Sequence, residues 1–177
     1  MQIFNTSQTN EIAQLLKSGK IGIMPTDTIY GIHCLANDPN LVDKIYQIKK
    51  RPDKIPLITI ISNLDDLLPF EVELNDYSHE QISRFWPGPN TLIFDTNQNE
   101  TRSFRMPDND FLLSILKITG PLISTSANLH GQQPAKDVND AIKYFADSID
   151  FYVDGGKMDN PPSNVYRINQ GTITKLR

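Results

Sequence analysis

Short apolar runs alternate along this chain with stretches of helical periodicity, and this alternation is what most constrains the fold. Runs such as Ile21–Met24, Pro56–Ile61 and Thr91–Phe94 have the length of buried strands. Between them, apolar residues recur at spacings of three and four, as in helices with one buried face. No internal repeat or low-complexity segment interrupts the pattern. We therefore predict an α/β fold with a mostly central, twisted sheet.

The predicted elements have recognisable boundaries. Helices are predicted at 10–18, from 39 toward 49, and at 64–68, 78–85, 111–117 and 138–145. Their predicted N-caps include Asp38, Asn63, Asp108 and Asp137. Further strands are predicted at 21–24, 56–61, 91–94, 101–104, 121–123, 151–153, 165–168 and 172–176, the last two joined by a turn around 169–171. At 177 residues the chain suits one well-filled core, so we expect a single domain over residues 1–177.

Composition narrows the class of protein. The net charge of −4 argues against a protein whose main role is to cover nucleic acid with positive charge. Cys34 is the only cysteine, so the chain cannot form an internal disulfide and fits a reducing compartment. The longest nearly apolar run, residues 55–61, is too short to cross a bilayer, and the first residues do not resemble a leader. We expect a soluble cytoplasmic protein without membrane contact.

The segment STSAN at 124–128 follows the apolar strand at 121–123. Alternate residues of an extended segment point to one face, so Ser124, Ser126 and Asn128 are predicted to converge on one ligand. Ligands of α/β sheets bind at strand ends. The alternative is turn or capping chemistry, which is the common role of such residues between a strand and a helix.

Two other segments admit a similar pair of interpretations. The loop PTDTIYG at 25–31 follows a strand and can be a ligand loop, or a plain turn in which Asp27 bonds its own backbone. Lys49 and Arg51 can simply favour the negative end of a helix dipole. Because Pro52 disfavours helical backbone at Arg51, these two cations are also predicted to leave the helix and reach one anion.

The remaining side chains exclude several chemistries. Three scattered histidines and one cysteine have no metal-ligand spacing, so we expect no metal held by protein side chains. The two common glycine-rich nucleotide loops are absent, and Ser126 lacks the glycine-flanked elbow of a hydrolase nucleophile. What remains is a set of donors suited to carboxylates and phosphates. Its members are Lys49, Arg51, Arg105, Arg177, Thr26, Thr28, Ser124, Ser126, Asn128 and Ser163.

Five motifs in register resemble the YrdC/Sua5 family, particularly its short, single-domain bacterial members. They are PTDTIYG at 25–31, KKRP at 49–52, WPGP at 86–89 with Thr91, RMP at 105–107 and TSAN at 125–128. The resemblance covers essentially the whole chain. It implies an open, twisted, mixed sheet with flanking helices and a concave basic surface. The chain departs from the family pattern at Lys50, Asn109, His130 and Asn164, and after Arg177.

The resemblance implies threonylcarbamoyl-AMP synthase activity. L-threonine, bicarbonate or CO2, and ATP with Mg2+ would give L-threonylcarbamoyladenylate and pyrophosphate, without a permanent cofactor. This is the first step of N6-threonylcarbamoyladenosine formation in tRNA. The product would pass to a downstream tRNA threonylcarbamoyltransferase complex, and weak binding of RNA or tRNA is also implied. Two alternatives remain open, namely a double-stranded RNA-binding module without synthase activity and a relative that forms a carbamoyl-adenylate from another amine.

The resemblance also assigns residues to substrates, without naming a catalytic acid, base or nucleophile. Lys49 and Arg51 would stabilise charge in the transition state. The implied ATP-binding residues are Lys49, Arg51, Thr101, Ser126, Asn128 and Arg177. The implied threonine-binding residues are Thr28, Arg105, Ser124 and Ser163.

Overall fold

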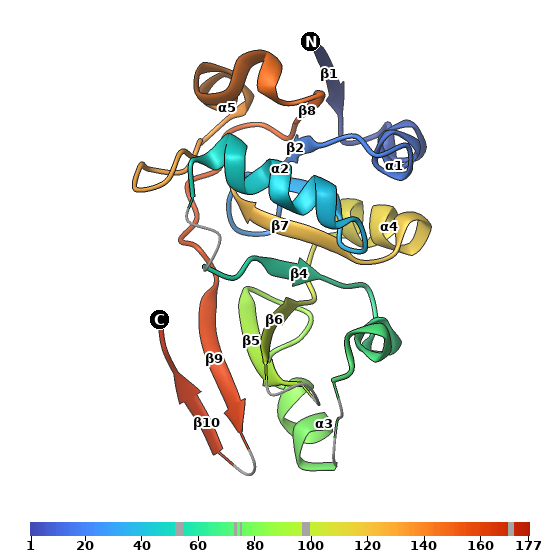
Figure 1. The fold of residues 1–177 in the computed structure, drawn as a ribbon, viewed down its shortest axis with the longest axis vertical. Helices are drawn as coiled ribbons and strands as arrows, with labels where there is room; N and C mark the ends of the chain where they lie inside the picture. The colour runs from blue at the N-terminus through green and yellow to red at the C-terminus, as the bar shows by residue number, and fades with distance from the viewer. Residues whose placement is uncertain (52–54, 73, 75, 97–99, 170–171) are drawn as a thin grey trace.

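The structure is a computed structural model, and it describes residues 1–51, 55–72, 74, 76–96, 100–169 and 172–177. The described strands form one ten-stranded sheet that runs the length of the molecule (Figure 1). In spatial order they are β1 (Gln2–Asn5), β8 (Phe151–Asp154), β2 (Gly22–Met24), β3 (Gly31–Leu35), β7 (Leu122–Ser126), β4 (Ile58–Ile60), β6 (Thr101–Arg105), β5 (Asn90–Asp95), β9 (Asn164–Asn169) and β10 (Thr172–Lys175).

The sheet is mixed and open. It contains parallel pairs such as β1–β8 and β5–β9 and antiparallel pairs such as β3–β7 and β9–β10. Strands β1 and β10 form its two edges. The predicted open, mixed α/β sheet with flanking helices is therefore confirmed.

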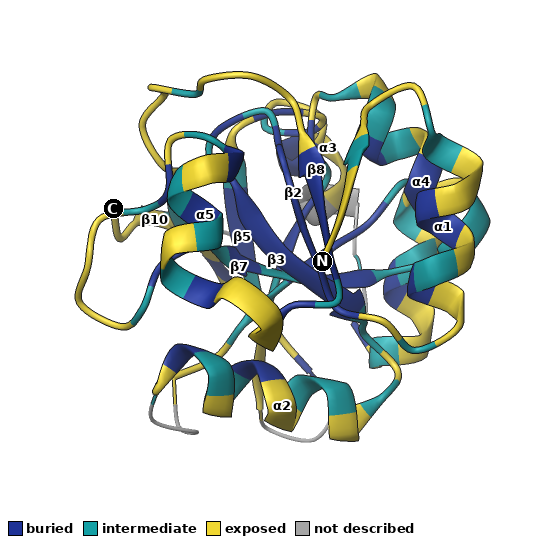
Figure 2. Cartoon of the chain, turned by 90° about the horizontal axis from the view of Figure 1, so that it is seen from above, coloured by how far each residue is buried: buried dark blue, intermediate teal, exposed yellow. Residues whose placement is uncertain are grey.

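The helices flank the sheet. They are α1 (Thr9–Lys17), α2 (Pro39–Lys49), α3 (Asp76–Ile82), α4 (Asp110–Thr119) and α5 (Val138–Phe145), with 3-10 turns η1 (Leu64–Phe70) and η2 (Ala146–Ser148). Figure 2 shows α2 and α5 on one side of strands β8, β2, β3 and β7, and α1 and α4 on the other. Within the described residues, no helix could cross a membrane.

Most of the predicted helix caps are confirmed. Asp38 accepts hydrogen bonds from the backbone N–H groups of Asn40 and Leu41, with Pro39 at the first helical position. Asn63 and Asp137 cap η1 and α5. The N-cap predicted at Asp108 is wrong: Asn109 Oδ1 accepts from Leu112 N at 3.0 Å, because α4 begins at Asp110.

Three apolar clusters form the core. One lies beneath α2 and α5 and includes Ile32 and Ile45, and the second lies beneath α1 and α4 and includes Leu16 and Leu122. The third fills the half of the molecule around β5 and β6 and includes Trp86. A fully buried aliphatic or aromatic side chain contributes about 1.5–3 kcal/mol, so these clusters are the main source of stability.

Several elements differ from prediction. Strands β1 and β3 lie in segments not predicted as strands, and β4 covers only Ile58–Ile60 of the predicted run. The predicted helix after Asn63 is a 3-10 helix, with Pro69 inside it removing a backbone donor. Pro52, Gln170 and Gly171 lie outside the described residues, so the structure does not test the roles predicted for them.

Candidate functional site

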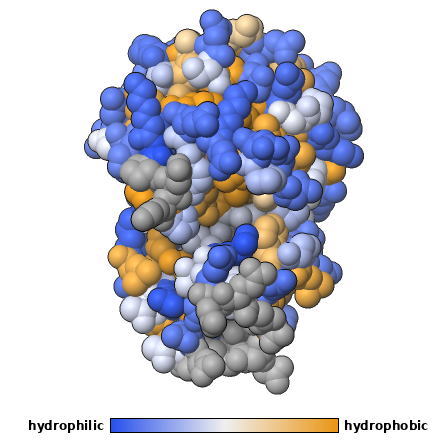
Figure 3. Space-filling model, in the orientation of Figure 1, coloured by the Kyte–Doolittle hydropathy of each residue, from blue (hydrophilic) through white to orange (hydrophobic). Residues whose placement is uncertain are grey.

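Two adjoining cavities lie where β7 meets β4 and the start of β9. The larger has a volume of about 320 Å³ and the smaller about 90 Å³. Both are lined by Ile58, Ser124, Thr125, Ser126 and Arg177. Figure 3 shows the surface hollowed between the upper and lower halves of the molecule. The larger volume is within the range of small-molecule binding sites.

Strand register builds one wall of these cavities. Strands β3 and β7 pair Leu35 with Leu122, His33 with Ser124, and Gly31 with Ser126. The leucine pair belongs to the cluster beneath α1 and α4, whereas Ser124 and Ser126 line both cavities. These alternate pairs share a sheet face, which therefore changes from apolar core to polar cavity wall along the strands. The prediction that Ser124 and Ser126 share a face is confirmed.

Gly31 keeps this wall open. A Cβ atom at Gly31 would lie 2.7 Å from Cε1 of His33 and 3.3 Å from Oγ of Ser124. Real Cβ atoms do not tolerate the first of these distances. Any side chain at position 31 would therefore displace the His33 ring.

The loop between β2 and β3 is shaped by Thr26. Its Oγ1 accepts hydrogen bonds from the backbone N–H groups of Thr28 at 3.0 Å and Ile29 at 3.2 Å. This local turn leaves the side chain of Asp27 free to bond to other segments of the chain. The Asp27 carboxylate bonds to Arg105 and to the backbone N–H of Asp108, so the predicted alternative, in which it bonds its own backbone, is wrong.

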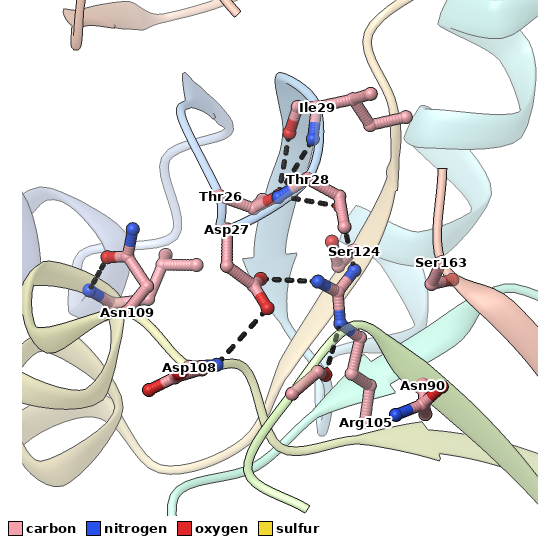
Figure 4. A network of polar contacts seen from close by, with 12 residues as sticks. Thr26, Asp27, Thr28, Ile29, Asn90, Arg105, Asp108, Asn109, Ser124 and Ser163 are labelled. Atoms are coloured by element: carbon pink, nitrogen blue, oxygen red, sulfur yellow. Dashed lines mark hydrogen bonds and ion pairs between the residues drawn. The ribbon is translucent and has the colours of Figure 1, made fainter. Parts of the chain in front are cut away.

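Arg105 is held by a buried network at the smaller cavity (Figure 4). Its Nη2 forms an ion pair with Asp27, and the two side chains are 8% and 9% exposed. Its Nη1 donates to Oγ1 of Thr28 at 2.9 Å, and its Nε donates to the carbonyl of Gly88 at 3.3 Å. The guanidinium is thus fixed in place, and its charge is partly balanced before any ligand binds.

Ser163 and Arg177 form the opposite wall. The Oγ of Ser163 lies 2.9 Å from Oγ1 of Thr91, and both residues are buried. Arg177 donates from Nε and Nη2 to the carbonyl of Ser163 at 3.2 and 3.0 Å. Because Arg177 lines both cavities, its guanidinium can serve a ligand in either.

Arg51 reaches the larger cavity from the end of α2. The prediction that it leaves the helix is confirmed: Lys50 adopts a left-handed conformation, φ 51°, and ends the helix. This conformation costs a non-glycine residue about 1–2 kcal/mol. Arg51 donates from Nη2 to the carbonyl of Pro56 at 3.0 Å and makes a long contact of 3.4 Å with Oγ1 of Thr125.

Lys49 is the last residue of α2, so the prediction that it leaves the helix is wrong; its side chain reaches the end of β7. Its Nζ donates to the carbonyls of Ser126 and Asn128, the latter at 2.7 Å, and to Oδ1 of Asn128 at 3.2 Å. The residue is 2% exposed. Burial, and next the charge of Arg51, lower the pKa of Lys49 to about 7, whereas the three oxygen acceptors favour the charged ammonium. The two cations therefore do not face one common site in this structure.

The carboxamide of Asn128 is also used internally. Its Oδ1 accepts from Oγ of Ser126 at 2.5 Å, and its Nδ2 donates to the carbonyls of Leu129 and Gln132. Asn128 lies beyond β7, so strand alternation does not carry its side chain to the face of Ser124. Together with Lys49, it supports the segment that follows the strand.

The structure thus brings most of the predicted site residues together. The smaller cavity is lined by Thr28, Arg105, Ser124, Ser126, Ser163 and Arg177, and the larger by Arg51, Thr101, Ser124, Ser126 and Arg177. Lys49 and Asn128 line neither cavity. Among the described residues, no group of three or more His, Cys, Asp or Glu side chains could hold a metal ion.

Four contributions were missed by sequence reasoning. Thr125 was not among the predicted site residues but lines both cavities, and Thr91 holds Ser163. His33 contacts Ser124, and Asp27 binds Arg105. Asp27 becomes predictable once the burial of Arg105 is known, because a buried arginine requires a carboxylate partner.

The fold and the cavities define an α/β protein with a cleft lined by arginines and hydroxyl groups, which suits small anionic molecules. The model of the Sua5/YciO/YrdC family, described as "Telomere recombination", matches residues 14–177. The chain belongs to this family.

Two similar proteins are named threonylcarbamoyl-AMP synthase, and one similar crystal structure contains L-threonine. The threonylcarbamoyl-AMP synthase of Cellvibrio japonicus is 26% identical over 166 residues, which cover 87% of this chain and 88% of that protein. The synthase of Pyrococcus abyssi is 30% identical over 155 residues, 82% of this chain and 46% of that protein. The crystal structure of P. abyssi Sua5 complexed with L-threonine has a TM-score of 0.89 at 26% identity and covers 100% of this chain. This chain spans about half the length of the P. abyssi protein.

Proposed function

We propose that this chain is a threonylcarbamoyl-AMP synthase. It forms L-threonylcarbamoyladenylate and pyrophosphate from L-threonine, bicarbonate or CO2, and ATP, for N6-threonylcarbamoyladenosine modification of tRNA. The observation that carries the proposal is the pair of adjoining cavities with shared walls and separate arginines. The family, the names of the relatives and the L-threonine complex of P. abyssi Sua5 support it.

The two cavities divide the substrates by size. The smaller, about 90 Å³, takes threonine near Thr28, Arg105 and Ser163, and the larger takes the nucleotide near Arg51 and Thr101. Their common wall brings the threonine amine beside the α-phosphate of ATP. Holding two reactants in this way replaces a bimolecular encounter by a step within one complex.

The chemistry has two steps. The amine of threonine attacks the carbon of CO2 and loses a proton, which gives a carbamate. A carbamate oxygen then attacks the α-phosphorus of ATP, and pyrophosphate leaves with the bonding electron pair. Both reactants are anionic, so Coulomb repulsion opposes their approach. Arg51 and Arg177, with Mg2+ carried by the phosphates, offset that repulsion.

In this proposal, each of the other predicted residues either contacts a substrate or holds the end of β7 in place. Ser124 donates a hydrogen bond from the common wall, and Arg105 binds the threonine carboxylate with its remaining N–H groups. Ser126 donates its one proton to Oδ1 of Asn128, and it exchanges that acceptor for a phosphate oxygen when the nucleotide binds. Lys49 and Asn128 hold the end of β7 in this structure. Their proposed contact with ATP requires Lys49 to exchange a carbonyl for a phosphate oxygen, and this contact stays a prediction.

Several wider assignments also stay predictions. They are a single domain over residues 1–177, a basic concave surface, a cytoplasmic location, weak RNA or tRNA binding, and transfer of the product to a tRNA threonylcarbamoyltransferase complex. Two of the positions that depart from the family pattern have structural roles. Asn109 caps α4, and Asn164 donates from Nδ2 to Oδ1 of Asn90 at 3.2 Å.

The test is release of pyrophosphate from ATP, measured with and without L-threonine and bicarbonate. We expect release that requires both compounds, and a product with the mass of L-threonylcarbamoyladenylate. Other amino acids are the controls, and a stronger response to one of them would replace threonine by that amine. No amine-dependent release, combined with salt-sensitive binding of double-stranded RNA, would instead favour a nucleic-acid-binding module.

A further inference from the structure

His33 occupies the boundary between the core and the proposed substrate cavities. It lies in β3, directly across from Ser124 of β7, and it is 0% exposed. The nearest pairs on the same sheet face are the partly buried Leu35 with the buried Leu122 on one side, and Gly31 with Ser126 of the cavity wall on the other. Burial lowers the pKa of His33 to about 3, so its ring is neutral near pH 7.

The two ring nitrogens of His33 have different surroundings. Its Nε2 lies 3.2 Å from Oγ of Ser124. Its Nδ1 is buried and has no hydrogen-bond partner among the described residues. A neutral imidazole has one N–H donor and one acceptor nitrogen, so the position of the proton decides which group is left unpaired.

The two tautomers have different consequences for Ser124. A proton on Nδ1 would leave a buried N–H without an acceptor and would make Nε2 accept the serine proton. A proton on Nε2 leaves only a lone pair unpaired at Nδ1, and orphaned buried N–H groups are rarer than under-satisfied acceptors. In that case Oγ of Ser124 accepts from His33, and its own proton is free to point into the cavities.

We propose that His33 is a positioning residue that carries its proton on Nε2 and thereby makes Ser124 a hydrogen-bond donor toward an anionic group in the cavities. This role rests on the proposed function only for the identity of that anion, a carboxylate or phosphate oxygen. Ser124 lines both cavities, so the donated proton lies at the common wall where the two substrates meet. His33 itself touches no substrate and transfers no proton in this role.

The tautomer can be measured without any enzymatic activity. The full chain, labelled with 15N at histidine, is studied by long-range 1H–15N correlation at pH 7.5, with His79 and His130 as solvent-exposed references. His33→Gln identifies the signals of His33 by their loss. We expect the pattern of a neutral ring protonated at Nε2. A ring protonated at Nδ1, or a rapidly averaged mixture of both tautomers, would overturn the proposal.

A double-mutant cycle tests the consequence for substrate binding. His33→Leu, Ser124→Ala and the double variant are compared for the KM of threonine, the KM of ATP, and kcat. A hydrogen bond to a charged group predicts a rise in KM of about tenfold or more for Ser124→Ala and a similar rise for His33→Leu. The double variant should be no worse than Ser124→Ala alone. Additive losses, or a loss confined to kcat, would overturn the proposal.

Two further measurements distinguish a failure of the His33 proposal from misfolding of a variant and from a failure of the proposed function. His33→Gln, whose Nε2 can still donate near Ser124, should recover part of the loss seen in His33→Leu, and thermal unfolding shows whether each variant is folded. If the wild-type chain shows no threonine-dependent release of pyrophosphate, the proposed function fails, but the tautomer is still decided by the spectrum. If that activity is present and the ring is protonated at Nδ1, only the role of His33 fails.

Discussion

The cleft has two arginine-bearing ends that are built differently. Arg105 is buried and forms an ion pair with Asp27, and its other bonds reach Thr28 and Gly88. At the other end, Arg51 and Arg177 donate to neutral oxygen atoms, and neither has a carboxylate partner among the described residues. The Arg105 end is thus fixed before a ligand binds, whereas the other end keeps its positive charge available for phosphates.

The largest effect is expected when the buried ion pair is broken. Asp27→Asn leaves the Arg105 guanidinium buried without its counter-charge, so the free energy of unfolding should fall by about 3–5 kcal/mol. Urea denaturation followed by circular dichroism measures this loss. The matched variant Asp95→Asn removes the exposed partner of Arg167 and should cost at most about 1 kcal/mol. Equal losses in the two variants would show that the Arg105 end is not held by its charge pair.

At the Arg51 end of the cleft, the expected loss is in catalytic activity rather than in the free energy of unfolding. Arg51→Gln removes an unpaired positive charge from the larger cavity, so pyrophosphate release should fall by about 10²–10³-fold. The free energy of unfolding should change by less than about 1 kcal/mol, since Arg51 leaves no buried carboxylate behind. Steady-state kinetics and urea denaturation measure the two quantities, with the exposed Arg84→Gln as the control. Full activity in Arg51→Gln would remove this residue from the nucleotide site.

The smallest effect is expected from His33, at the cavity wall between the two arginine-bearing ends of the cleft. The pKa of His33 is about 6.5 in an unfolded chain and about 3 when buried, so the unfolded state binds an extra proton between these values. The stability contributed by the neutral ring is fully present above pH 6.5 and is lost as the pH falls toward 3. Between pH 7.5 and 5.0, wild type should lose about 2 kcal/mol more than His33→Leu does. Denaturation of both proteins at the two pH values measures the difference, and equal losses would contradict a buried neutral histidine.

Much of the fold follows from local signals. Asp38 with Pro39, and Asn63 and Asp137, are recognised as caps because the bonds they make are with their own helix. Strand β1 has no such signal, because it is mostly exposed and pairs with β8, far along the chain. In β3, Gly31 and His33 interrupt the apolar pattern, since that face becomes a cavity wall.

Most residues of the site could be predicted from the sequence, but the directions of several of their side chains could not. Arginine and hydroxyl side chains at strand ends indicate anion binding, and most of those predicted do line the two cavities. The direction of Lys49 could not be read from sequence, because its acceptors are carbonyls at Ser126 and Asn128 on a distant segment. The same holds for the His33 contact, which depends on the register between β3 and β7.

The order of the strands has a consequence for how the chain folds as it is synthesised. Hairpins β2–β3, β5–β6 and β9–β10 join neighbours in sequence and can form early. Strand β1, however, pairs with β8, where Gln2 meets Phe151, and β3 pairs with β7, where Gly31 meets Ser126. Such distant pairings slow folding and prolong the exposure of unpaired strand edges. The nascent chain therefore carries β1, with the apolar Ile3 and Phe4, without its partner until β8 leaves the ribosome. The strand has only four residues, and this shortness limits aggregation during that interval.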